Sequence, residues 1–475
     1  MRRLLLIVFL LLGLLVPAAA QTPDDPNQAI ERRGRAAIDA PGDAQPLTNN
    51  PDRVPNRLEQ IDRLKDALIP TPGFDRFVQP WYDFKGRLSE NLGLDLGFYY
   101  TMLYQKADPR DPFSLVGMGR DEASGGWFGI VGQWELLGRG TNHPGILGFQ
   151  LQQRHRIGAV VPQNIGPEIG SLWPTAIGYS ELTFSAVELY WAQWLVKDRL
   201  GLVFGKQIPF AVHDYFAYKS PLDGFLNASF GLNQSIGYAE AGLSAGAGAR
   251  PTKSTYILGG VYDGNGKLNR AGFDSFFNER EYFVAVDVGW DPGYLEGSQE
   301  VYIGPLRIRD VHATFWHKDH LKRVNSPEGW GVTLFAEGEI GRVVPFLRYG
   351  YSQGTSRGNP ALVDDLIAGG VGLTDVFGQS DDLIGIGFSY ARFGLGPLGR
   401  PDPVDLTGDG IPDIDLGDVA RDLLRTHQYA GEIFYRIQLT QELQITPNLQ
   451  MIWDPSLNRD EDKVAVFGLR GRAEW

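Results

Sequence analysis

The chain has 475 residues with 60 Gly, 30 Pro and no Cys, which argues against long helices, a disulfide scaffold and cysteine-ligated metal sites. Its 57 acidic residues outnumber its 44 basic ones and no basic tract occurs, so binding to nucleic acid is not expected. Apolar residues make up 43% and charged residues 21%, as in an ordinary folded protein.

The first twenty residues have the features of a secretory signal peptide. Arg2 and Arg3 supply the positively charged start, residues 4–16 the apolar stretch and residues 18–20 the small-residue cleavage site. Cleavage would leave a chain that begins at Gln21 with 42 basic residues against 57 acidic ones, a net charge of about −15. Past the signal no run of about 18 uncharged apolar residues occurs, so the sequence predicts no transmembrane helix.

Residues 21–80 form a leader that is rich in Pro, Asp, Asn and Gln and lacks a strand-like alternation, as in a flexible segment. Within it, apolar residues recur at helical spacing: Leu58, Ile61, Leu64 and Leu68. Asn56 is a candidate N-cap, with Glu59 three residues later. This pattern predicts a short amphipathic helix. It either lies on the surface or, if the remainder is a barrel, extends across or into the barrel mouth.

Residues 81–475 consist of short alternating segments separated by Gly, Pro, Asn and Asp, the period-two pattern of β-strands. In residues 147–156, Gln and Arg side chains share one face, while Leu147, Phe149 and Leu151 share the other. The same division recurs in residues 94–102, 429–439, 443–453 and 465–475. At roughly 22–25 residues per strand and connection, this region would hold about sixteen strands, and eighteen would also fit.

Aromatic residues gather near the ends of these segments: Tyr99, Tyr100, Tyr104, Trp191, Trp194, Trp290, Tyr349, Tyr351, Tyr390 and Trp453. Such girdles are typical of membrane barrels, which turn an apolar face to lipid and enclose polar side chains. The predicted fold is therefore an all-β, transmembrane antiparallel barrel over residues 81–475. The last segment ends in Trp475, similar to the C-terminal signal by which the assembly machinery recognises outer-membrane barrels.

Segments in a fixed order resemble the carbohydrate-selective porin family of the OprB type, most densely in residues 434–440 (FYRIQLT). The matching segments are residues 81–94, 186–193, 198–206, 225–231, 260–263, 347–351, 380–387, 434–440, 447–450 and 468–470. The chain departs from the family in its long leader, in its final Trp where Phe is usual, and in residues 394–421, which have no counterpart. The resemblance implies an integral outer-membrane channel of sixteen strands that passes monosaccharides or short oligosaccharides by diffusion.

Sugar passage requires hydrogen-bond partners for hydroxyl groups and aromatic faces for C–H surfaces, with contacts weak enough to release the sugar. The polar faces of the predicted strands and the matching segments supply candidate pore residues: Gln150, Gln152, Arg154, Arg156, Glu188, Tyr190, Trp194, Arg348, Glu432 and Arg436. Alternatively, inward Arg and Glu side chains pair across neighbouring strands and keep the lumen hydrated.

An acidic segment has the ligand spacing of a calcium loop: Asp405, Thr407, Asp409, Ile411 and Asp413. Gly410 occupies the turn position, but Leu416 stands where an EF-hand has a bidentate Glu, which excludes an ordinary EF-hand. A calcium-binding external loop and an unliganded acidic turn both remain open. No other cofactor is expected.

Enzymatic motifs lack their structural context. Ser244 lies in a Gly-x-Ser-x-Gly pattern with no helix pattern after it, and residues 394–399 match a dinucleotide fingerprint by letter only. The five-residue separation of His312 and His317 places them on opposite faces of a strand, so they are not expected to share a metal. We therefore expect no catalysis. The alternatives to a sugar channel are a general diffusion porin, a barrel enzyme and an exported sugar-binding β-sandwich.

Overall fold

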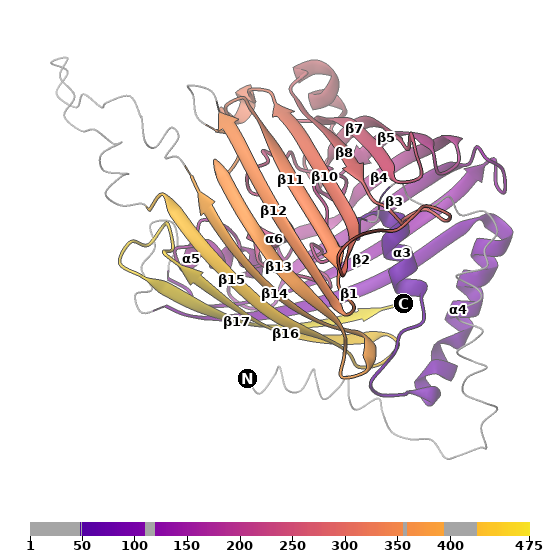
Figure 1. Ribbon diagram of the computed structural model, residues 1–475, viewed down its shortest axis with the longest axis horizontal. Coiled ribbons are helices and arrows are strands. Elements are labelled where there is room, and N and C mark those ends of the chain that lie inside the picture. Colours follow the sequence, from indigo (N-terminus) through magenta and orange to yellow (C-terminus); the bar gives the residue numbers. More distant parts are fainter. Residues whose placement is uncertain (1–47, 49, 110–118, 355–358, 394–424) are drawn as a thin grey trace.

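The computed structural model describes residues 48, 50–109, 119–354, 359–393 and 425–475. Sixteen strands pair antiparallel with their neighbours, and β1 pairs with β17 to close the ring, while the short strand β9 pairs with β10 (Figure 1). The predicted antiparallel barrel of sixteen strands is thereby confirmed. Among the helices described, none has the length and apolar character needed to cross a membrane.

The strands are β1 (Leu94–Asp108), β2 (Glu122–Leu137), β3 (Gly145–Arg156), β4 (Leu182–Val196), β5 (Leu200–Gln207), β6 (Gly242–Ala249), β7 (Thr255–Asp263), β8 (Tyr282–Trp290), β9 (Val301–Ile303), β10 (Leu306–Lys318), β11 (Gly329–Glu339), β12 (Val343–Gly354), β13 (Asp365–Val376), β14 (Gln379–Arg392), β15 (His427–Gln438), β16 (Leu443–Trp453) and β17 (Lys463–Glu474). The helical elements are α3 (Val54–Asp62), α4 (Pro72–Leu92), η1 (Pro162–Asn164), α5 (Ile165–Glu168), η2 (Pro209–Ala211), α6 (Ala228–Gly231), η3 (Ser275–Glu279) and η4 (Lys322–Val324).

The alternation of side chains separates the inside of the barrel from the outside. In β1, Thr101 and Gln105 are buried in the lumen, while Tyr100 and Tyr104 are half-buried on the outer face. The expected aromatic girdle is wrong at two positions, because Tyr99 and Trp194 point inward and are buried. Successive side chains of a strand point to opposite faces, and both residues occupy inward positions. Their orientation is therefore set by this alternation and not by their place near the end of the strand.

The two ends of the barrel differ in the length of their connections. At one end β4 and β5 are joined by residues 197–199, and β13 and β14 by residues 377–378. At the other end residues 208–241 separate β5 from β6. Short turns face the periplasm in outer-membrane barrels, so we name the first the periplasmic end.

The leader helix α3 lies inside the barrel, where it contacts β1, β2 and β3. Val54, Leu58 and Ile61 are buried, as expected if the helix enters the barrel mouth. The expected N-cap is wrong: the helix begins at Val54, and the amide of Asn56 instead donates to the carbonyl of residue 50 at 2.7 Å. Pro at the second helical position favours this earlier start. The helix ends before Leu64 and Leu68.

The nine residues after α3, 63–71, cross the periplasmic end of the barrel, and we name residues 63–69 the rim segment. The backbone N–H groups of Leu68 and Ile69 donate to the carbonyls of Gln438 and Leu439, at 2.9 and 2.8 Å. Helix α4 follows and includes residue 81, which was the predicted start of the barrel. The barrel wall therefore begins later, at Leu94.

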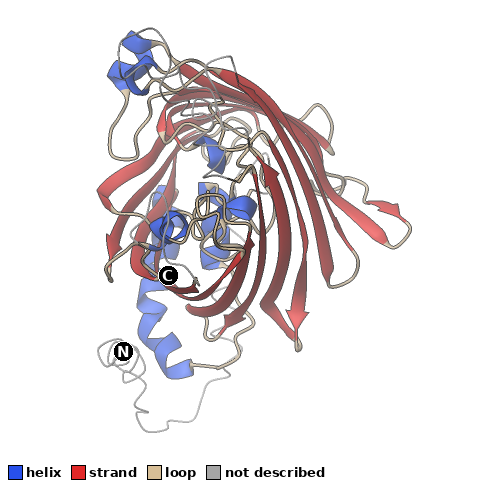
Figure 2. Cartoon of the chain, turned by 90° about the vertical axis from the view of Figure 1, so that its left-hand side faces the viewer, coloured by secondary structure: helices blue, strands red, loops and turns tan. Residues whose placement is uncertain are grey.

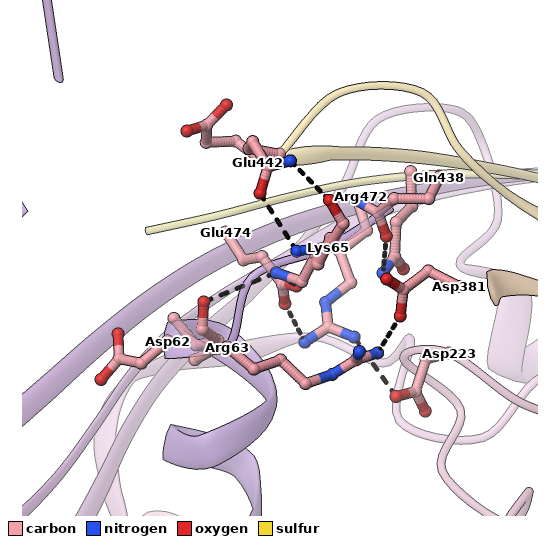
Figure 3. Close-up of polar contacts among 12 residues, drawn as sticks. Asp62, Arg63, Lys65, Asp223, Asp381, Gln438, Glu442, Arg472 and Glu474 are labelled. Atoms are coloured by element: carbon pink, nitrogen blue, oxygen red, sulfur yellow. Dashed lines mark hydrogen bonds and ion pairs between the residues drawn. The ribbon is translucent and has the colours of Figure 1, made fainter. Parts of the chain in front are cut away.

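A buried cluster of charges holds the rim segment to the last strand (Figure 3). Lys65 and Arg472 both form ion pairs with Glu474, and the side chains of all three are 1–2% exposed. Burial lowers the pKa of the Lys65 ammonium, and attraction to the Glu474 carboxylate opposes this effect. The side-chain amide of Gln441 binds the backbone of Lys65 through two hydrogen bonds. The amide oxygen accepts from the Lys65 N–H, and the amide NH₂ group donates to the Lys65 carbonyl.

Replacing Lys65 by Glu would place a second carboxylate beside Glu474 in a buried site. An uncompensated buried charge costs on the order of 3–5 kcal/mol, so we expect the rim segment and α3 to leave the lumen. Conductance in planar bilayers should therefore rise. The matched control is Arg87→Glu: this side chain is exposed on α4, so reversing its charge should leave conductance unchanged. Equal conductance of Lys65→Glu and the native chain would contradict the prediction.

Candidate functional site

The lumen is largely filled by the chain itself, as the helices and loops inside the ring of strands show (Figure 2). We name residues 208–241, between β5 and β6, the inner loop. Its Phe216, Phe225 and Phe230 form an apolar cluster with Phe346 and Phe434 of the wall. The period-two pattern gave no indication of this cluster, since a loop has no periodicity. The available signal was a long run of aromatic and small residues between two strands.

The candidate residue Arg348 of β12 binds the inner loop rather than an open pore. Its guanidinium pairs with the Asp214 carboxylate at 3.1 Å and donates to the carbonyls of Ser229 and Phe230, at 3.0 and 2.7 Å. The side chains of Arg348 and Asp214 are almost completely buried. Loop carbonyls that would otherwise lack partners in the lumen are satisfied in this way.

Two candidates on β15 have the same role. The Glu432 carboxylate accepts from two consecutive loop N–H groups beginning at Leu226, at 2.8 and 2.9 Å. Arg436 donates to the carbonyls of Asp223 and Asp381, at 3.4 and 3.1 Å. Both side chains hold the inner loop against the wall. They also bond to the neighbouring strands, Arg436 to Asp381 of β14 and Glu432 to Asn448 of β16 at 2.6 Å.

Arg470 on β17 is a loop anchor that was not among the sequence candidates. It donates to the carbonyls of Pro221 and Gly224, at 2.8 and 3.0 Å. Inside the loop, Lys219 is buried and its ammonium donates to the carbonyl of Phe210 at 2.5 Å, while burial lowers its pKa. The loop is thus folded by charge-assisted hydrogen bonds from both the wall and its own chain.

The candidates on β3 form a polar row that faces α3 and the loops. The amides of Gln150 and Gln152 lie 3.1 and 3.4 Å from the Tyr99 hydroxyl. Arg154 donates to Gln152 at 3.0 Å, and its guanidinium lies 4.3 Å from the centroid of the Trp127 ring. These groups are brought together, and each already has a partner within the protein.

Arg156 lies apart from this row. Its side chain is exposed at the end of β3, where it donates to a loop carbonyl at 3.3 Å and lies 3.8 Å from Glu181. An ion pair between two exposed side chains contributes little to stability. Of the β3 candidates it is therefore the one placed outside the buried lumen.

Two of the three candidates on β4 border free space. Glu188 is buried and accepts from the N–H of Ile208 at 3.5 Å, at the start of the inner loop. Tyr190 and Trp194 line a cavity of about 80 Å³ between the start of α3 and the wall. Further polar or aromatic groups that line this cavity are Arg53, Gln133, Gln207 and Tyr262. The sequence alone did not indicate these four.

Small residues open this side of the lumen. Gly201, Gly246 and Gly248 line the same cavity at inward positions of β5 and β6. Without side chains they leave the space that larger inward residues would occupy.

A second cavity of about 180 Å³ lies between the inner loop and strands β10 and β11. Its charged lining includes Asp291, Arg307, Arg309, Asp310 and Glu337. The Trp194 ring of the first cavity and the Tyr215 ring of the second belong to one aromatic cluster. The two free spaces are therefore neighbours, bordered mainly by strands β3–β11, and the anchor Arg348 lies on β12, the strand next to β11.

The remaining sequence motifs either lie outside the described residues or form no metal or catalytic site within them. Residues 394–399 and the calcium candidates 405–413 lie outside them, as does the signal peptide. Within them, no group of His, Cys, Asp and Glu is arranged to hold a metal ion. His312 is buried and His317 is half exposed on the opposite face, as predicted. Ser244 donates to the carbonyl of Gly205 and the amide oxygen of Gln207, at 2.8 and 3.0 Å.

A closed sixteen-stranded barrel with an apolar exterior and a polar, loop-filled lumen defines an outer-membrane porin. Residues 148–474 match the family described as carbohydrate-selective porin, OprB family, and the chain belongs to this family. Family and fold together identify it as a sugar-preferring channel of the outer membrane. No curated protein is similar enough in sequence to count as a match.

Solved structures share the fold at low sequence identity. Pseudomonas putida OprB is 13% identical with a TM-score of 0.61, and the alignment covers 83% of this chain and 97% of that one. Vibrio cholerae OmpT without its loop L8 is 10% identical with a TM-score of 0.44, over 80% and 99% of the chains. Salmonella typhi OmpF in complex with daunomycin is 9% identical with a TM-score of 0.43, over 80% and 97%.

Replacing Arg348 by Met would leave the Asp214 carboxylate buried without its charge partner. We expect a loss of stability on the order of 3–5 kcal/mol and release of the inner loop. The readouts are a lower temperature for loss of the folded electrophoretic band and a higher conductance. Arg156→Met, which removes an exposed arginine, should change stability by less than about 1 kcal/mol. Similar behaviour of the two variants would show that Arg348 does not anchor the loop.

Proposed function

We propose that monosaccharides or short oligosaccharides diffuse passively along the β3–β11 side of the lumen, through the two cavities. The observation that supports this route is that the two cavities adjoin at one cluster, which contains Trp194 of the first and Tyr215 of the second. The inner loop is fixed beside them by contacts with β12, β15 and β17 and also with the β7–β11 side, where Tyr215 donates to Asp310 at 3.0 Å. Cavities of about 80 and 180 Å³ favour the smaller permeants, since the route between α3, the loop and the wall is narrow.

The two cavities offer the group types that neutral polyols need. Tyr190, Trp194 and Tyr262 present aromatic rings to the first, and Gln133 and Gln207 add amide groups. Carboxylates and guanidinium groups line the second. Several weak hydrogen bonds and ring contacts in succession allow entry and release, as a channel requires. Contact of sugar with Gln150, Gln152, Arg154, Arg156 and Glu188 stays a prediction.

A general diffusion porin would have the same fold but no sugar site. Its ion conductance would not respond to added sugar. The closed barrel excludes the β-sandwich alternative. An enzyme is not part of the proposal, because the Ser244 hydroxyl donates to neutral acceptors that cannot take up the proton of a nucleophile.

The proposal includes export by the signal peptide of residues 1–20 and recognition of the last strand by the barrel-assembly machinery. That strand ends beside β1, where Trp475 and Phe98 exchange two backbone hydrogen bonds of 2.8 and 2.9 Å. No cofactor is required for diffusion. Calcium binding by residues 405–413 stays a prediction that concerns an external loop.

Single-channel conductance of the purified chain, with glucose or maltose on both sides of the bilayer, tests the proposal. We expect current blocks at millimolar sugar, and a roughly fivefold higher sugar concentration for half-block in Trp194→Ala, as for a lost ring contact of about 1 kcal/mol. Trp191→Ala is the matched control, because Trp191 lies on the outer face of the same strand. Currents that are not blocked by any of the sugars would favour a general diffusion porin.

A further inference from the structure

Helix α4 carries an apolar stripe that the barrel does not cover. Phe74, Phe77, Trp81, Phe84 and Leu88 recur every three or four residues and therefore share one side of the helix. The Phe77 side chain is 79% exposed, and those of Phe84 and Phe74 are 42% and 37% exposed. Single exposed apolar residues are ordinary, but a continuous stripe marks an interaction surface.

Contacts with the barrel fix the rotation of the helix. Lys85 is buried and forms an ion pair with Asp62 at the end of α3. One turn further, near the C-terminal end of α4, the Arg139 guanidinium donates to the carbonyls of Ser89, at 2.6 Å, and Glu90. The flank of Lys85 thus faces the barrel, and the stripe cannot turn toward it.

The stripe continues onto the lipid-facing wall. The Trp81 ring contacts the Phe98 ring edge to face, with centroids 5.3 Å apart, and Phe98 lies on the outer face of β1. The Trp134 indole, exposed on the outer face of β2, donates to the carbonyl of Leu92 at 3.0 Å. Figures 1 and 2 place α4 at the periplasmic end, with its N-terminal half beyond the outline of the strands.

The side of α4 away from the stripe is polar. Arg76, Asp83, Arg87 and Glu90 are exposed there. A helix with aromatic residues along one side and charged residues along the other is suited to the plane of a membrane interface.

We propose that α4 lies in the periplasmic interface of the outer membrane, with its stripe inserted among the phospholipids of the inner leaflet. The continuity of the stripe with the outer wall selects lipid over other occupants. A helix lying in water would expose the stripe next to the membrane. The stripe lies beside the outer faces of β1 and β2, which face lipid. A second copy of the chain could cover the stripe only by replacing that lipid.

The absence of cysteine from the sequence allows a direct test. Phe77→Cys and the matched control Arg76→Cys each place one thiol on neighbouring, exposed positions of the full chain. Each variant is labelled with a nitroxide and reconstituted in vesicles of phosphatidylethanolamine and phosphatidylglycerol. We expect the ratio of collisions with oxygen to collisions with a water-soluble nickel complex to be at least about fivefold higher at position 77, because oxygen concentrates in lipid.

Equal ratios at the two positions would overturn the proposal in favour of a helix in water. Dipolar broadening at position 77 that disappears on dilution with unlabelled chain would overturn it in favour of a second copy. Folding is checked by the electrophoretic shift of unheated barrel. If Phe77→Cys does not fold, Phe84→Cys probes the same stripe, and its 42% exposure leaves room for the label.

Discussion

The pairing of β17 with β1 is the constraint on which the rest of the structure depends. In a closed ring the backbone N–H and C=O groups of the wall strands find hydrogen-bond partners on both neighbouring strands, so no sheet edge is exposed to the membrane. Closure also brings the inward side chains of the last strand beside elements from other parts of the chain. Arg470 binds the inner loop, and Glu474 binds Lys65 of the rim segment. The strand that completes the wall therefore also fixes the filling of the lumen.

The use of charge in the lumen follows from the cost of burying polar groups. An irregular loop inside a barrel presents carbonyl and N–H groups that no strand can pair, and inward Arg and Glu side chains of β12, β15 and β17 satisfy them. These charges fold the loop and are not free to act on a permeant. Beside the first cavity the polar and aromatic groups are mostly neutral amides and aromatic rings, the types suited to neutral sugars, whereas carboxylates and guanidinium groups line the second.

The sequence predicted the wall better than its contents. A period of two is a local property, so the two faces of β1, β3 and β15 could be derived from neighbouring residues alone. The pairing of Arg348 with Asp214 joins residues 134 positions apart and has no local signal. Local rules also misplaced the cap of α3 at Asn56, because its amide is used by the preceding loop. The candidate pore residues lie on the inner face apart from Arg156, which is exposed at the end of β3, but their partners could only come from the fold.

The leader illustrates how a short helix is stabilised by its two ends. Nine residues are too few for a stable isolated helix, so α3 depends on contacts with the barrel. Before the helix, Asn50 donates to the carbonyl of Ala211 in the inner loop at 2.9 Å. After it, the rim segment is bound to the last strand, and α4 follows on the outside of the barrel. Because the start of α3 borders the first cavity, the width of the proposed sugar route is determined jointly by the barrel, the inner loop and the leader.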